Sequence, residues 1–122
     1  MTTKTTSTFL ATIAAGAMLL GASQVLAHAK LVAANPVPNA TVAAPKALSL
    51  KFSEKLEPKF SGFEIANAAG AAISIKTTVA ADGKGLEGAL ATPLAPGAYK
   101  VTWHAVTADA HRMNGAYTFT VR

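Results

Sequence analysis

The strongest constraint on the fold is a strict alternation of apolar and polar residues in three separate segments. Residues 48–53, 99–104 and 117–122 each place an apolar side chain at every second position. A period of two is typical of β-strands with one buried face, because successive side chains point to opposite sides of the sheet. No segment after residue 28 sustains the period of an amphipathic helix. The sequence therefore predicts an all-β fold.

Proline- and glycine-containing segments separate the predicted strands. Asp82-Gly83 is typical of a tight hairpin, because glycine accepts the positive φ of such turns, and residues 86–90 are expected to return as the partner strand. The alternation at 73–79 predicts another strand, whereas the alanine-rich stretch 66–72 is expected to be a loop. Residues 31–32 are expected to begin an edge strand. Several short strands at this spacing predict a two-sheet sandwich or a Greek-key barrel.

Residues 1–27 have the features of a secretory signal peptide. Lys4 supplies a basic start, residues 9–20 form an almost unbroken apolar run, and small residues precede the expected cleavage point between Ala27 and His28. Cleavage there divides the chain into a signal peptide, 1–27, and one exported domain, 28–122. The apolar run is short for a membrane span, so the domain is expected to be soluble and periplasmic. The chain contains no cysteine, so no disulfide can stabilise it there.

The distribution of charge argues against a nucleic-acid-binding function. The formal net charge of the chain is +5, with 11 lysines and arginines against 6 acidic residues. The basic residues are scattered, and no basic run is interleaved with aromatic residues as in nucleic-acid-binding grooves. The lysines are therefore interpreted as part of a solvated surface.

The three histidines of the chain, at positions 28, 104 and 111, are the first candidates for metal binding. Cleavage before His28 would leave an α-amine and an imidazole on one residue, and such a pair can chelate a single ion. Both nitrogens are borderline ligands that suit Cu(II) best among the divalent metals. A frayed terminus that happens to carry a histidine is the alternative interpretation.

Asp109 and His111 can complete this set of ligands. They are two residues apart, so in an extended backbone their side chains leave the same face and can reach one ion. A solvated turn is the alternative for such a pair taken alone. Together with His28, the pair predicts one Cu(II) per mature chain, bound more weakly in acid because the nitrogen ligands become protonated. His104 follows Trp103, a predicted core residue, and is expected to face solvent; an auxiliary role near the metal stays open.

Four segments of the chain resemble the CopC family of bacterial copper-resistance proteins, in the order in which the family carries them. They are His28-Ala29-Lys30-Leu31-Val32, Lys51-Phe52-Ser53-Glu54-Lys55-Leu56, Pro96-Gly97-Ala98-Tyr99-Lys100-Val101-Thr102-Trp103, and Asp109-Ala110-His111 before Gly115. The resemblance covers essentially the whole of residues 28–122. It implies an immunoglobulin-like or cupredoxin-like Greek-key β-sandwich located in the periplasm.

The resemblance also implies how copper is held. Cu(II) would be bound by the amine and imidazole of His28, by Asp109 and by His111. An acidic residue matching Glu54 lies near the copper in the family, where it can hydrogen-bond a ligand or a metal-bound water. A solvated charge at the end of a strand is the alternative for Glu54. The implied partner for copper transfer is a CopD-type inner-membrane protein.

The chain departs from one feature of the family. Several CopC proteins carry a methionine-rich loop for Cu(I), but the matching region, 65–75, contains no methionine. Met113 is the only methionine after the signal peptide, and one thioether cannot form a Cu(I) site of the usual thioether-rich kind. A protein that binds Cu(II) alone is the consistent prediction.

These features predict a periplasmic copper-binding protein for resistance, buffering and transfer, and not an enzyme. A copper oxidase or monooxygenase is the competing interpretation, because lytic polysaccharide monooxygenases also combine an N-terminal histidine chelate with a second imidazole. Asp109 would occupy a coordination position that such catalysis needs open. An adhesion-type sandwich with incidental histidines is the third interpretation. Loss of copper binding on substitution of Asp109 or His111 would separate it from the others.

Overall fold

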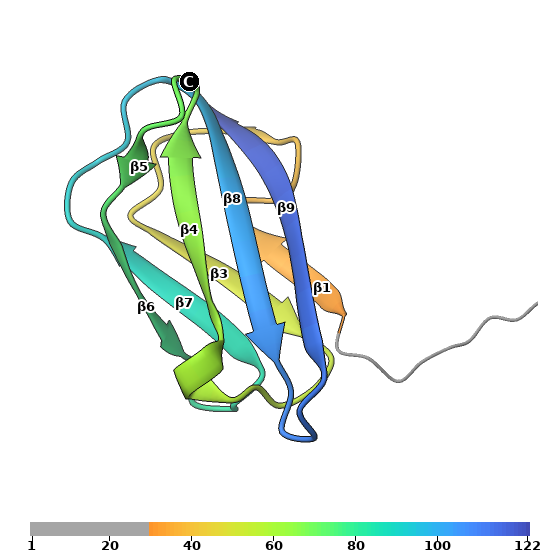
Figure 1. The fold of residues 1–122 in the computed structure, drawn as a ribbon. Helices are drawn as coiled ribbons and strands as arrows, with labels where there is room; N and C mark the ends of the chain where they lie inside the picture. The colour runs from red at the N-terminus through yellow and green to blue at the C-terminus, as the bar shows by residue number, and fades with distance from the viewer. Residues whose placement is uncertain (1–29) are drawn as a thin grey trace, which may run out of the picture.

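The computed structural model describes residues 30–122, and Figure 1 shows that they form strands and one short 3₁₀ helix, η1 (Pro58–Phe60). The strands are β1 (Leu31–Asn35), β2 (Thr41–Val42), β3 (Ala47–Phe52), β4 (Gly62–Asn67), β5 (Ala72–Ile73), β6 (Ile75–Val79), β7 (Gly85–Leu90), β8 (Gly97–Val106) and β9 (Arg112–Val121). The predicted all-β fold is confirmed. The expected signal peptide, 1–27, and His28 lie outside the described residues. Within residues 30–122, no helix has the length and apolar character needed to cross a membrane.

The strands form the two sheets of a β-sandwich (Figure 1). The four-stranded sheet has the order β1-β3-β7-β6, and all its neighbouring strands are antiparallel. The five-stranded sheet has the order β2-β9-β8-β4-β5, in which β2 runs parallel to β9 and the other neighbours are antiparallel. β1 lies at the edge of its sheet, as predicted. The sandwich architecture predicted from the sequence is therefore confirmed.

Alternate side chains of both sheets fill the space between them. Every second residue of β3 is buried and the residues between are exposed, which is the pattern that the alternation predicted. Phe52 of β3 meets Trp103 of β8 edge to face, with ring centroids 5.0 Å apart. Tyr99 stacks on Phe119 at 5.7 Å. Such aromatic pairs contribute about 0.5–1.5 kcal/mol each beyond the apolar area that they bury. The first pair joins the two sheets, and the second joins the neighbouring strands β8 and β9.

β8 and β9 form a long hairpin whose loop, residues 107–111, lies at one end of the sandwich (Figure 1). The register runs from Gly97 opposite Val121 to Val106 opposite Arg112. Gly115 lies opposite Trp103, and the indole ring covers it so closely that a Cβ at this position would lie 2.5 Å from Trp103 Cζ2. The close approach of the ring therefore requires glycine at position 115.

The strand predicted over residues 73–79 proves to be two strands in different sheets. β5 pairs with β4 in the five-stranded sheet, whereas β6 pairs with β7 in the four-stranded sheet. The chain crosses between the sheets at Ser74. Ile73 and Ile75 both pack against the core. The apolar alternation therefore continues across the crossing, and it gives no sign that the chain changes sheet.

The alanine-rich stretch 66–72 is only partly a loop, which corrects the prediction. Ala66 of β4 pairs with Ala72 of β5, so both residues belong to a β-hairpin. Asn67 closes the turn between them, because its side-chain oxygen accepts the backbone N–H groups of Ala69 and Ala71 at 3.0 and 2.9 Å. Asn side chains commonly stabilise turns in this way.

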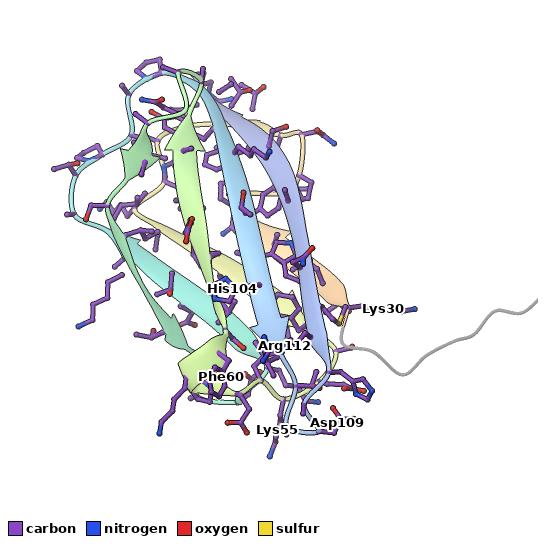
Figure 2. The ribbon with its side chains drawn as sticks, viewed as in Figure 1. Lys30, Lys55, Phe60, His104, Asp109 and Arg112 are labelled. Atoms are coloured by element: carbon purple, nitrogen blue, oxygen red, sulfur yellow. The ribbon has the colours of Figure 1, made fainter. Side chains whose placement is uncertain are left out.

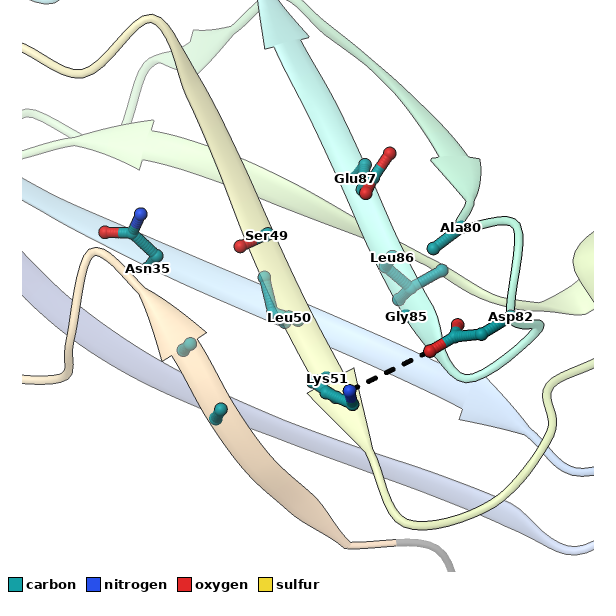
Figure 3. A pocket seen from close by; sticks show the side chains of 11 residues that line it. Asn35, Ser49, Leu50, Lys51, Ala80, Asp82, Gly85, Leu86 and Glu87 are labelled. Carbon is teal, nitrogen blue, oxygen red and sulfur yellow. Dashed lines mark ion pairs between the residues drawn. The ribbon is translucent and has the colours of Figure 1, made fainter.

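The four-stranded sheet has a depression on its outer face. Figure 3 shows a hollow of about 300 Å³ on this face, between β1, β3 and β7. At one end of it, Lys51 Nζ lies 3.8 Å from Asp82 Oδ2 and connects β3 to the turn before β7. Gly83 in that turn has φ 77°, which confirms the hairpin predicted at Asp82-Gly83. Both charged groups are exposed, so their pairing contributes less than about 1 kcal/mol.

Candidate metal site

A tight turn at the end of the β8–β9 hairpin brings together the two described residues predicted to bind metal. The N–H of Thr107 donates to the carbonyl of His111 at 2.9 Å, and the N–H of Ala110 donates to the carbonyl of Thr107 at 2.8 Å. Ala110 has φ 73°, a left-handed conformation that reverses the chain direction between Asp109 and His111. The loop is therefore a closed turn and not the extended segment assumed from the sequence.

Asp109 and His111 nevertheless lie side by side, as predicted. The distance between Asp109 Oδ2 and His111 Nδ1 is 2.9 Å, and both side chains are largely exposed. A carboxylate that accepts the Nδ1–H of an imidazole fixes the ring tautomer, which leaves the lone pair on Nε2. The pair thus offers an oxygen donor and a nitrogen donor to an ion that approaches from solvent.

Thr107 supports this pair from below the surface. Its side chain is buried, with a relative exposure of 1%. The Thr107 hydroxyl donates to Asp109 Oδ1 and accepts the backbone N–H of His111 at 3.2 Å. One buried hydroxyl therefore positions both donor residues. The sequence analysis missed Thr107; a threonine two residues before an aspartate was the available signal, but such a pair is common in turns.

The hydrogen bonds around Asp109 also stabilise its charged form. The hydroxyl of Thr107 and then the imidazole of His111 lower the pKa of the Asp109 carboxyl from 3.8 to about 2. Hydrogen bonds donated to a carboxylate favour ionisation, because they are weaker or lost when it is protonated. Asp109 is therefore a carboxylate at any pH near neutrality and carries the negative charge that a cation requires.

The bend at residues 53–56 lies between this loop and the start of the described chain. On one side, the N–H of Lys30 donates to Ser53 Oγ at 2.9 Å and the N–H of Ser53 donates to the Lys30 carbonyl at 3.0 Å. On the other side, the N–H of Ala108 donates to the Lys55 carbonyl at 3.2 Å, and the next residue of the bend, Leu56, forms a β-bridge with Thr107. Lys30 and the 107–111 loop are thus joined through a few residues.

Glu54 lies within this bend, between the residues that contact Lys30 and Ala108. Its side chain is half-buried. Figure 2 shows Lys30, Lys55 and Asp109 at the same end of the sandwich. His104 is exposed, as predicted, on the outer face of β8, with its ring against Gly62.

Asp109 and His111 alone do not make a complete metal site. Among residues 30–122, no group of three or more histidine, aspartate or glutamate side chains is arranged to hold an ion. The third predicted ligand, His28, lies outside the described part of the chain. The described residues therefore supply one half of the predicted donor set.

The sequence pattern of the CopC domain family matches residues 31–122. The chain belongs to the CopC family. The match includes every strand of the sandwich and the Asp109–His111 loop, so the CopC domain and the described structure coincide.

Several relatives are similar to this CopC chain over most of their length. The copper resistance protein C of Xanthomonas campestris pv. juglandis is 36% identical over 118 residues, which are 91% of this chain and 93% of the relative. The protein YobA of Escherichia coli is 45% identical over 103 residues, which are 80% of this chain and 82% of YobA.

Solved structures agree with the CopC sandwich. The crystal structure of PcoC, a methionine-rich copper resistance protein from Escherichia coli, superposes with a TM-score of 0.74 and 37% identity, covering 79% of this chain and all of PcoC. The crystal structure of CopC from Methylosinus trichosporium OB3b gives a TM-score of 0.72 and 33% identity, covering 77% of this chain and 93% of that one. At these identities both the fold and the family are shared.

Proposed function

We propose that this CopC chain is a periplasmic copper-resistance protein that binds one Cu(II) through His28, Asp109 and His111. The observation that carries the proposal is the Asp109–His111 pair, with 2.9 Å between Oδ2 and Nδ1, on a loop joined through one bend to Lys30. The names of the relatives, copper resistance protein C and PcoC, support a role in copper resistance.

The position of Lys30 supports the participation of His28. An extended backbone spans at most about 3.6 Å per residue, so the Cα of His28 lies within about 7 Å of the Cα of Lys30. Lys30 is hydrogen-bonded to Ser53, and Lys55 in the same bend bonds to Ala108. These contacts support the participation of His28, because they connect both the start of the described chain and the 107–111 loop to the same bend.

The proposed donor set favours Cu(II) for chemical reasons. An α-amine, two imidazoles and one carboxylate supply three nitrogens and one oxygen, which suit the tetragonal coordination of Cu(II). The charge of Asp109 offsets part of the charge of the ion. Glu54 would act outside the ligand set, through a hydrogen bond to a ligand or to a metal-bound water. The domain would stay a Cu(II) protein, since Met113 is the only methionine of the described chain.

The proposed role is to buffer copper and to exchange it with a membrane protein of the CopD type. Export and cleavage between Ala27 and His28 would be required first, because the α-amine of His28 exists only after cleavage. The relatives named as copper resistance proteins support a binding protein, so we propose that copper is the cargo of the domain and that the domain does not act as an enzyme.

The first test is Cu(II) titration with electron paramagnetic resonance on two forms of the domain. One form begins at His28, and the other carries one additional residue before it. We expect tight one-to-one binding and a nitrogen-rich tetragonal signal from the first form, and a great loss of affinity in the second, because the added peptide bond removes the free α-amine. Equal binding by both forms, or none by either, would exclude His28 as a ligand.

A further inference from the structure

A shallow pocket lies on the outer face of the five-stranded sheet, beside the 107–111 loop. It has a volume of about 380 Å³, and Lys59, Phe60, His104, Arg112 and Asn114 contribute to its lining. We call it the basic–aromatic pocket. Figure 2 shows Phe60, His104 and Arg112 near the end of the sandwich where Asp109 lies.

Backbone contacts hold the parts of the basic–aromatic pocket in place. His104 and Asn114 are directly opposite each other in the β8–β9 ladder, and Val106 is opposite Arg112. The η1 helix is attached to the end of β8, because the N–H of Glu57 donates to the Val106 carbonyl at 2.7 Å and the N–H of Val106 donates to Ser61 Oγ at 3.0 Å. Phe60, within η1, is therefore presented by a fixed segment.

Phe60 is an exposed aromatic ring in a sandwich that otherwise covers its rings. Its relative exposure is 57%, whereas every other aromatic residue of the described chain is buried or half-buried. An exposed aromatic side chain surrounded by polar groups is characteristic of the anchor residues of protein interfaces. Phe60 therefore offers an exposed apolar contact beside the cations of this pocket.

The charged groups of the pocket are of one sign. Lys59 and Arg112 are exposed, and within residues 30–122 neither forms an ion pair with a carboxylate. Two carboxylates belong to neighbouring positions: Glu64 is opposite Thr102, two positions beyond the pair of Gly62 and His104, and Glu57 directly precedes η1. No acidic residue lines the pocket itself, so its unpaired cations complement an anionic group.

We propose that the basic–aromatic pocket docks an acidic segment of a protein partner, with Phe60 packing against an apolar side chain and with Lys59 and Arg112 pairing with carboxylates. Two cations and one ring are too few for a nucleic-acid groove, which needs many phosphate contacts. Arg112 directly follows His111 in the chain. On the proposed function, a partner held here would lie beside the copper, so the pocket would select the molecule that gives or receives the ion.

The test uses the domain beginning at His28, labelled with ¹⁵N, and a short synthetic peptide in which glutamates flank one leucine. We expect the largest shift changes at Lys59, Phe60, His104 and Arg112. The matched peptide with glutamines in place of the glutamates should bind about tenfold more weakly. It loses the ion pairs with Lys59 and Arg112, and each exposed ion pair contributes up to about 1 kcal/mol. Added salt should weaken the binding of the glutamate peptide.

Variants locate the binding surface. Lys59→Gln with Arg112→Gln should weaken the glutamate peptide about tenfold, and Phe60→Ser should weaken it by a similar factor because it removes the anchor. The matched control is Lys100→Gln with Lys76→Gln, which removes two exposed lysines elsewhere and should change binding less than about twofold. Equal weakening by the control pair, or equal binding of both peptides, would overturn the proposal.

Two further measurements separate this proposal from its competitors. The first measurement is binding of the domain to vesicles that contain anionic lipid. If the parent domain binds the vesicles, Phe60→Ser does not, and the peptide does not bind at all, the pocket is a membrane-binding surface and the partner proposal is contradicted. Cu(II) binding by the same variants, followed by electron paramagnetic resonance, should be unchanged. If Cu(II) does not bind to the parent domain but the peptide still docks on this pocket, the proposed function fails and the docking surface stands.

Discussion

Thr107 connects two exposed residues of the 107–111 loop. It is the buried member of the loop, and its hydroxyl bonds to both the side chain of Asp109 and the backbone of His111. The two residues predicted from the sequence are therefore the exposed part of a three-residue arrangement. The spacing of Asp109 and His111 predicted the pair, but only the folded loop shows what holds it.

Replacing Thr107 by valine should loosen this arrangement while keeping the buried volume. Without the hydroxyl, the pKa of Asp109 should rise from about 2 towards its ordinary value of 3.8, because the Thr107 hydrogen bond is the largest cause of the shift. Cu(II) affinity should fall by about tenfold, as for partners that orient metal ligands. Carboxyl ¹³C titration by NMR and Cu(II) titration check the two results. Thr107→Ser, which keeps the hydroxyl, is the control and should behave like the parent.

The pKa of Asp109 also predicts how copper affinity depends on pH. Because its folded value is lowered to about 2, the carboxylate and its contacts are retained above the ordinary value and are lost only as the pH falls towards 2. Asp109 therefore takes up no protons between about pH 8 and pH 5, where amines and imidazoles titrate. The weakening of Cu(II) binding in that range should come from nitrogen ligands alone.

Competition titrations at several pH values measure this dependence. In the Asp109→Asn variant, whose side chain does not titrate, the affinity should be lower at every pH but should decline with the same slope. A shallower slope in the variant would mean that the carboxylate exchanges protons in this range, which contradicts the assigned pKa.

At the scale of elements, the β8–β9 hairpin shows how packing determines a position that the pattern leaves open. Gly115 lies at an inward position of β9 opposite Trp103, and the indole occupies the space where a Cβ would be. Trp103 cannot retreat freely, since its ring also packs edge to face on Phe52 at 5.0 Å. Trp103 of β8 can therefore pack in the core only because β9 has no side chain at position 115.

Gly115→Ala should destabilise the domain by about 1–3 kcal/mol through overpacking against Trp103. Urea denaturation, with the midpoint and the slope both recorded, measures the change. Ala116→Ser, at the neighbouring exposed position, should stay within about 0.5 kcal/mol of the parent. In a Trp103→Phe background the cost of Gly115→Ala should shrink, because the smaller ring makes room; additive effects would mean that the two residues do not interact.

The sequence predicted most strands but not how they connect the two sheets. Alternation identified β3, β8 and β9 because each has one face in the core and one in solvent. It failed at Ser74, because Ile73 and Ile75 face the same core from different sheets. β2 was also missed, since two residues paired in parallel with the end of β9 leave no periodic signal. The alternation of apolar residues indicates which face of a strand is buried, but it does not indicate which strand pairs with it.

For the molecule as a whole, copper binding and folding stability should be linked. Cu(II) that binds the folded chain more tightly than the unfolded chain raises the free energy of unfolding, by about 2.7 kcal/mol when free copper is 100 times the dissociation constant. Differential scanning calorimetry of the domain beginning at His28 should therefore show a higher Tm with Cu(II). His111→Ala should abolish the shift, whereas the control His104→Ala should keep it. A full shift in His111→Ala would place the copper elsewhere.

The bend between Lys30 and Thr107 has a consequence for where and when the chain can capture copper. The proposed ligands come from opposite ends of the sequence, and this bend is the short span over which the two ends meet. Neither the uncleaved precursor nor an unfolded chain would hold all the donors together. Copper capture would then require both cleavage of the signal peptide and folding. A newly made chain would therefore leave the cytoplasm without the metal.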